Sequence, residues 1–202
     1  CIRDSNTVVK SDDEELIRQM NLEAAKSLKY GNMPLQAALQ LVTLNSAKEL
    51  GLEARIGTLE VGKDGDVAIF NGHPFSPFSR VEMTIIEGEV RFQRDQQPTA
   101  MTKAGRERSA KPPALELAAE EVRARKLTLP EEGTLLAITN AAIHPVDGPD
   151  IAQGTIIVRD GKIESVAADA AVPEGAKIID ATGMHVYPGL IDAGTTLGIA
   201  EI

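Results

Sequence analysis

Two neighbouring carboxylates near the start of the chain are the first side chains whose type and position could do chemistry. Asp12 and Asp13 directly follow Ser11 and a β-branched run at residues 7–9, which predicts a short strand. An acid at the end of a strand can bind a cation or accept a proton from water. However, Ser11 and Glu14 also have the spacing of a helix capping box, and an acidic first turn complements the helix dipole. Spacing alone therefore favours a helix start over an active site.

The three histidines are the other candidates for metal or acid–base chemistry. His73 and His144 each precede a proline, and His185 lies on the last predicted strand. None of them has a second ligand at the short sequence spacing that is typical of metal sites. We therefore expect these histidines to be structural or surface residues.

The elements that must position these residues follow from the hydrophobic periodicity. Apolar residues recur at helical intervals over residues 13–30, with Gly31 as the stop signal, and further helices are predicted at 34–42 and 45–51. Hairpins are predicted around Glu87-Gly88, over residues 81–94, and around Asp160-Gly161, over residues 155–166. The remaining predicted strands are 67–70, 135–142, 177–180 and 185–186. Between the two groups of strands, a polar linker with one helix at 114–126 is predicted.

Length and composition limit the function classes. The 202 residues are too few for a complete eight-stranded α/β barrel, which takes roughly 250. A net charge of -9 argues against a nucleic-acid partner, and no run approaches the 18 apolar residues of a membrane span. The single cysteine, Cys1, cannot form an internal disulfide, so the cysteine content does not indicate a redox compartment. The sequence does not distinguish a cytoplasmic from a periplasmic location, because a signal peptide would lie upstream of these residues.

Two groups of motifs resemble the amidohydrolase superfamily, specifically its imidazolonepropionase-like branch. Residues 45–51 together with 56–67 resemble the carboxy-terminal signature of that family, and residues 136–192, including Pro188-Gly189-Leu190-Ile191-Asp192, resemble its amino-terminal signature. The resemblance implies a metal-dependent (β/α)8 barrel and a small β-sandwich whose strands come from both ends of the chain. The expected fold class is therefore a mixed α/β fragment, with a composite β-sandwich and helices from the end of a barrel.

The order of the two signatures is reversed, since the carboxy-terminal one comes first. Two amidohydrolase units in tandem would give this order at their junction, and a circularly permuted enzyme is the alternative. We favour the tandem, because each of its two units keeps the ordinary order of elements along the chain. On this basis residues 1–55 end a first barrel, 56–94 are its last sandwich strands and 95–132 are the linker. Residues 133–188 are then the first sandwich strands of a second unit, and 189–202 include its first barrel strand. The strands on the two sides of the linker are expected to build one β-sandwich.

The resemblance also assigns roles to particular residues. Asp12 matches the Asp at the end of the eighth barrel strand, which binds the metal and takes a proton from the metal-activated water. The family motif Pro-Gly-Leu-Ile-Asp-x-His-x-His has Gly194 and Thr196 at its two histidine positions in this chain. Neither residue can replace an imidazole ligand. The second unit is therefore expected to be impaired in metal chemistry.

These expectations combine into one functional hypothesis and an alternative. The parent protein is expected to hydrolyse the C–N bond of a cyclic amide or dipeptide-like substrate with a divalent metal, zinc being the first choice. The isolated segment, which lacks the other ligands, is expected to be inactive and to bind no metal. Its partners would be the missing barrel portions, with a homo-oligomer also possible. The alternative is a non-catalytic binding or scaffolding domain derived from such an enzyme.

Overall fold

The helices of the described residues form one group and come from the amino-terminal part of the sequence. The computed structural model describes residues 6–11, 16–94 and 134–194. A 3-10 helix, η1 (Leu16–Gln19), leads into α1 (Met20–Gly31), which is followed by α2 (Leu35–Gln40) and α3 (Leu44–Glu49). The end of α1 is formed by Asn32, whose left-handed φ of 53° lets its N–H reach the Ser27 carbonyl. The predicted stop residue, Gly31, is the last residue of the helix.

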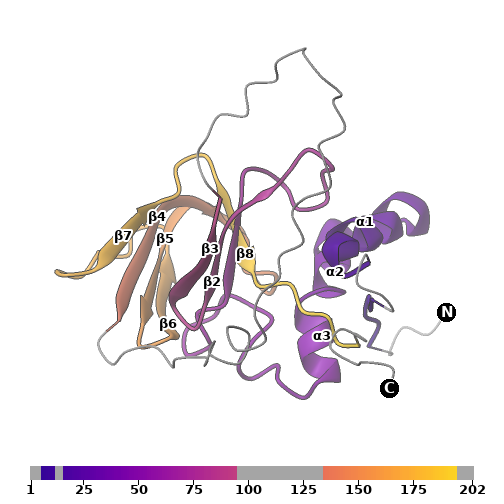
Figure 1. The fold of residues 1–202 in the computed structure, drawn as a ribbon, viewed down its shortest axis with the longest axis horizontal. Helices are drawn as coiled ribbons and strands as arrows, with labels where there is room; N and C mark the ends of the chain where they lie inside the picture. Colours follow the sequence, from indigo (N-terminus) through magenta and orange to yellow (C-terminus); the bar gives the residue numbers. More distant parts are fainter. Residues whose placement is uncertain (1–5, 12–15, 95–133, 195–202) are drawn as a thin grey trace, which may run out of the picture.

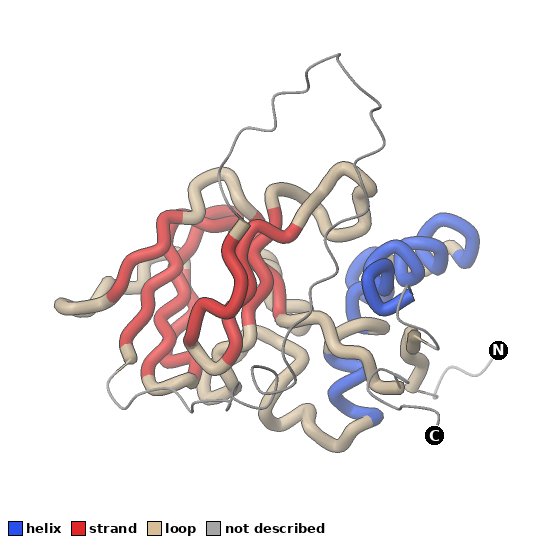
Figure 2. Tube along the Cα trace, viewed as in Figure 1, coloured by secondary structure: helices blue, strands red, loops and turns tan. Residues whose placement is uncertain are grey.

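All strands of the described part belong to one sheet. They are β1 (Val67–Phe70), β2 (Val81–Ile86), β3 (Glu89–Gln93), β4 (Leu135–Ile143), β5 (Ile151–Arg159), β6 (Lys162–Ala167), β7 (Lys177–Asp180) and β8 (His185–Pro188). The strand order is β3-β2-β1-β8-β4-β5-β6, with β7 paired to β4 off this path. Figure 1 shows the sheet on one side of the molecule and the three α-helices on the other. The tube in Figure 2 shows the same division.

At the centre of the sheet, a strand that precedes the predicted linker pairs with a strand that follows it. β8 pairs with β1 antiparallel and with β4 parallel, so strands from residues 67–93 and from residues 135–188 are continuous. This pairing agrees with the expectation that both groups of strands build one structure. That this structure is a β-sandwich of the amidohydrolase type stays a prediction, as do the segment boundaries. The predicted helix at 114–126 lies outside the described residues.

The main hydrophobic core is aliphatic and draws on both groups of strands. Val67, Ile69 and Ile85 pack in one cluster with residues such as Ile138 and Ile156, and all five are at most 1% exposed. A second cluster, around Phe70 and Tyr187, connects the sheet to the helices through Leu39 and Leu44. No helix within the described ranges is both long and apolar enough to cross a bilayer.

Candidate functional site

The segment at residues 6–11 has no regular secondary structure. The β-branched run at 7–9 predicted a strand, which is wrong in the structure. A strand needs a neighbour along its length, whereas this segment has only isolated bonds: the Val9 N–H donates to the Leu41 carbonyl at 3.1 Å, and the Asn45 amide donates to the Thr7 carbonyl at 2.9 Å. The segment is therefore held against the helices and not within a sheet.

Ser11 makes a tertiary contact with Asp192. Its side-chain hydroxyl donates to one carboxylate oxygen of Asp192, and its N–H donates to the other at 3.3 Å. The Asp192 carboxylate also accepts the Gly194 N–H at 3.1 Å. Ser11 is fully buried, so its hydroxyl has no access to water as an alternative partner. The predicted partner in the capping box, Glu14, lies outside the described residues.

The positions at which the family binds metal are only partly described. Asp12, the predicted ligand, and Thr196, which was predicted not to bind metal, lie outside the described residues, whereas Gly194, also predicted not to bind metal, lies within them. A Cβ atom built on Gly194 would come within 2.7 Å of Cδ of Lys10. The side-chain stem of Lys10 therefore occupies the space that a side chain at position 194 would need.

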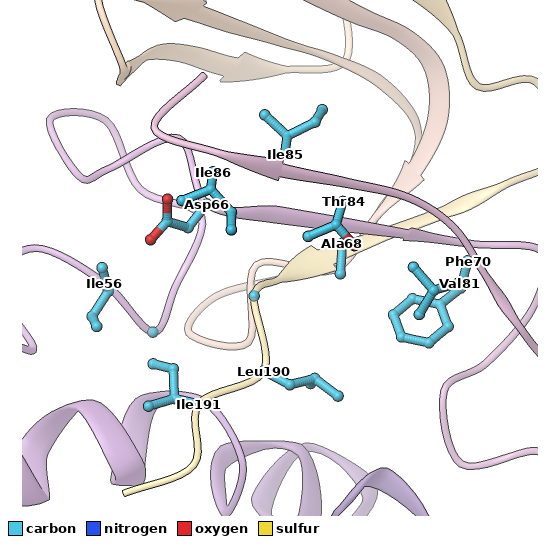
Figure 3. Close-up of a pocket in the computed structure, with 12 residues that line it drawn as sticks. Ile56, Asp66, Ala68, Phe70, Val81, Thr84, Ile85, Ile86, Leu190 and Ile191 are labelled. Atoms are coloured by element: carbon cyan, nitrogen blue, oxygen red, sulfur yellow. The ribbon is translucent and has the colours of Figure 1, made fainter. Parts of the chain in front are cut away.

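The segment that follows β8 enters a gap between the sheet and the helices. The Gly189 N–H donates to the Asp66 carbonyl at 2.9 Å, and the Ile191 N–H donates to the Val42 carbonyl at 2.8 Å. Beside this segment lies a cavity of about 320 Å³ with a mainly apolar lining. Figure 3 shows Leu190 and Ile191 on one side of this cavity and side chains of β1 and β2 on the other.

Asp66 is the only ionisable side chain among the described residues that line this cavity. Burial raises the pKa of its carboxyl group, and the hydrogen bond from the Glu87 N–H to Oδ1, at 2.8 Å, acts in the opposite direction. That bond stabilises the turn between β2 and β3. The cavity thus offers an apolar surface with one acid that already has a structural role.

A second polar cluster contains all three histidines of the chain. Nδ1 of His144 lies 2.8 Å from Oδ2 of Asp150, and its Nε2 lies 3.0 Å from Nδ1 of His185. Tyr187 stacks on His144, with ring centroids 4.4 Å apart. The His73 ring meets the Tyr187 ring edge to face, with centroids 5.8 Å apart. The expectation of separate structural or surface histidines missed this association.

The geometry of the cluster fits a chain of hydrogen bonds. The His144 and His185 rings are within 14° of parallel, with centroids 5.3 Å apart, so the two bonded nitrogens point nearly at each other. If Nδ1–H of His144 donates to Asp150, its Nε2 can accept from Nδ1–H of His185. Such a chain can relay a proton but leaves no room for a metal between the rings. Across residues 6–11, 16–94 and 134–194, no three His, Cys, Asp or Glu side chains group as a metal site.

Comparison with known proteins identifies the class to which these motifs belong. A family model described as "Amidohydrolase family" matches residues 28–92. Amidohydrolase tasK of Hapsidospora irregularis is 25% identical over 188 residues, which are 90% of this chain and 19% of tasK. Imidazolonepropionase of Thermoplasma volcanium is 39% identical over 66 residues, which are 32% of this chain and 16% of that protein. L-hydantoinase of Paenarthrobacter aurescens is 36% identical over 55 residues, which are 27% of this chain and 12% of that protein.

A solved amidohydrolase from Thermotoga maritima MSB8 is also similar in sequence. It is 43% identical over 37% of this chain and 19% of its own chain, with a TM-score of 0.35. These matches support the amidohydrolase superfamily that the motifs predicted. It spans less than a fifth of the length of each of these curated relatives.

Proposed function

We propose that this chain is part of a metal-dependent amidohydrolase that hydrolyses C–N bonds in a cyclic amide or dipeptide-like substrate. The names of two relatives, an imidazolonepropionase and an L-hydantoinase, support this reaction class. The family match begins at residue 28, shortly after Asp12 in the sequence. The isolated chain should be inactive, because the metal ligands other than Asp12 would come from the rest of the protein. In agreement with this, no three His, Cys, Asp or Glu side chains of the described residues group as a metal site.

The contact between Ser11 and Asp192 carries the assignment of Asp12 to the active site. Asp192 belongs to the segment that resembles the start of the first barrel strand, and Ser11 directly precedes Asp12. The segment that precedes Asp12 thus lies against the segment that opens the predicted first barrel strand of the second unit. A divalent metal, with zinc as the first choice, would activate water for attack on the substrate. The Asp12 carboxylate would bind the metal and take the proton.

The lengths of the relatives support a tandem arrangement of two units. The match to tasK is 19% of that protein, which makes tasK about 990 residues long. The corresponding lengths are about 410 residues for the imidazolonepropionase and about 460 for the L-hydantoinase. A relative of twice their length that matches 90% of this chain is what a junction between two units would produce. The partners of this segment would then be the remaining portions of both barrels.

Substitution of Asp12 in the full-length protein tests the catalytic assignment. We expect Asp12→Asn to lower kcat by at least about 100-fold, since it removes both a ligand and a general base. The neighbouring Asp13→Asn variant is the matched control and should keep most of the activity. Equal activity of the two variants would refute the role of Asp12, and hydrolysis by the isolated chain with added metal would refute its expected inactivity.

Gly194 favours a second function for the second unit, namely binding or scaffolding without catalysis. Gly194 stands where the family has its first histidine, and glycine has no side chain that could bind a metal. Metal analysis of the full-length protein distinguishes the two functions. A non-catalytic second unit predicts the metal content of one active site per chain, and a content of two sites would contradict it.

A further inference from the structure

The two groups of strands meet along a single strand pair. β1 and β8 are paired at all four positions, including Ile69 opposite Val186 and Ala68 opposite Tyr187. β1 uses its other edge for β2, and β8 uses its other edge for β4. The β1–β8 pair is therefore the one strand contact within the described residues that joins 67–93 to 135–188.

The hairpin turns at Glu87-Gly88 and Asp160-Gly161 both contact Gly65, which strengthens the connection between the two groups of strands. The Gly65 N–H donates to the Gly161 carbonyl at 2.7 Å, and the Gly88 N–H donates to the Gly65 carbonyl at 3.3 Å. A Cβ on Gly65 would come within 2.6 Å of Val158 Cγ1, and one on Gly161 within 3.0 Å of the Glu87 carbonyl oxygen. Only residues without side chains permit this close approach of the two backbones.

An ion cluster also spans the two groups. The Asp64 carboxylate, which is 5% exposed, accepts a bond from Arg55 at 2.7 Å and another from Lys162. Arg55 precedes the first group of strands in the sequence, and Lys162 is the first residue of β6. The association of the two groups of strands is thus favoured by a shared aliphatic core, by strand pairing, by glycines where the backbones approach closely and by a buried carboxylate.

We propose that the two units of the full-length protein exchange strands at this junction. The strands that close the first unit, β1–β3, are completed by the strands that open the second unit, β4–β8, within the same chain. The opening strands of the first unit and the closing strands of the second are then left to pair with each other. This inference rests on the proposed tandem arrangement. Its consequence is that the two units are interlocked and remain together when the linker is cut.

A disulfide across β1 and β8 tests this exchange in the full-length protein. In a Cys1→Ser background, Ile69→Cys and Val186→Cys place two thiols directly opposite each other, within the range that a disulfide can span. The control pair, Ile69→Cys with Met83→Cys, lies across β1 and β2 and joins residues of one group only. Both proteins carry a protease site inserted between Gly105 and Arg106, are oxidised, cut, denatured without reductant and run on a gel.

Strand exchange predicts one band of full mass after cutting for the protein with the β1–β8 cross-link and two smaller bands for the control. Before cutting, the cross-linked protein should run as a monomer. Two bands for both proteins would overturn the proposal, since each unit would then close its own sheet. A dimer before cutting would also overturn it, by showing exchange between two copies. The result does not depend on hydrolysis, so it is separate from the outcome of the Asp12 test.

Discussion

The side-chain hydroxyl of Ser11 donates a hydrogen bond to the carboxylate of Asp192, which lies 181 positions further along the chain. The same carboxylate accepts the backbone N–H groups of Ser11 and Gly194. Three donors from two distant segments therefore meet at one acid. Because Asp12 follows Ser11 directly, the geometry of the proposed active-site segment depends on a residue at the opposite end of the described chain.

Removal of the Asp192 carboxylate should therefore destabilise the chain. We expect Asp192→Ala to lower the free energy of unfolding by about 1–3 kcal/mol, since the buried hydroxyl of Ser11 loses its acceptor. Asp192→Asn keeps one acceptor oxygen and should have a smaller effect. Urea denaturation measures both, with the exposed Asp169→Ala as the control. If Asp192→Ala and Asp169→Ala were equally stable, the contact would contribute nothing to the fold.

The cluster around Asp64 leads to a second prediction. Arg55 and Lys162 are 59% and 50% exposed, so each can be hydrated when its partner is lost, whereas the Asp64 carboxylate is buried. Arg55→Met or Lys162→Met alone should cost up to about 1 kcal/mol, because the other cation still pairs with the acid. The double variant should cost more than the sum of the two, since it leaves a buried charge without a partner.

Urea denaturation of the wild type, the two single variants and the double variant measures the coupling free energy between the two substitutions. The exposed pair of Arg159 and Glu164, with 46% and 45% exposure, provides the comparison, and its cycle should show a coupling below about 1 kcal/mol. Strict additivity of the Arg55 and Lys162 substitutions would contradict this prediction, because it would show that neither cation compensates for the loss of the other.

Local structure was predictable where a few consecutive residues determine it. Glu87-Gly88 and Asp160-Gly161 were expected to form hairpin turns, and in both pairs the two residues have positive φ. Apart from the strand predicted at residues 7–9, the described helices and strands lie close to their expected positions, because their apolar periodicity agrees with the faces that they bury. The superfamily was recognised from the same local motifs.

Contacts between distant residues were not predictable from the sequence pattern. Ser11 has the local signature of a helix cap, and its actual partner, Asp192, gives no sign of the contact. His144 and His185 meet because β4 and β8 pair in parallel, with Ala142 opposite His185. That register depends on how the strands pack in three dimensions, so the spacing of the histidines in one sequence does not contain it.

The last prediction concerns the pH dependence of stability. Burial lowers the pKa of His73, and the nearby imidazoles of His144 and His185 lower it further, while Asp150 acts in the opposite direction. Burial also lowers the pKa of His185, followed by the effect of His144. The unfolded chain therefore binds protons at a higher pH than the folded chain does. Stability is greatest above the ordinary histidine pKa of 6.5 and is lost as the pH falls through it and then through the lower folded values.

Urea denaturation between pH 7.5 and 5.5 checks this direction. His73 and His185 can each contribute at most about 1.4 kcal/mol per pH unit. The variant His73→Asn should reduce the slope, because an amide oxygen can still accept the Phe75 N–H that Nδ1 of His73 accepts at 3.1 Å, but it does not titrate. Burial raises the pKa of Asp66, which changes stability in the opposite sense, but this contribution is common to both proteins and cancels in their comparison. A wild-type chain whose stability rose toward pH 5.5, or an unchanged slope in His73→Asn, would show that the histidine cluster is not a source of acid sensitivity.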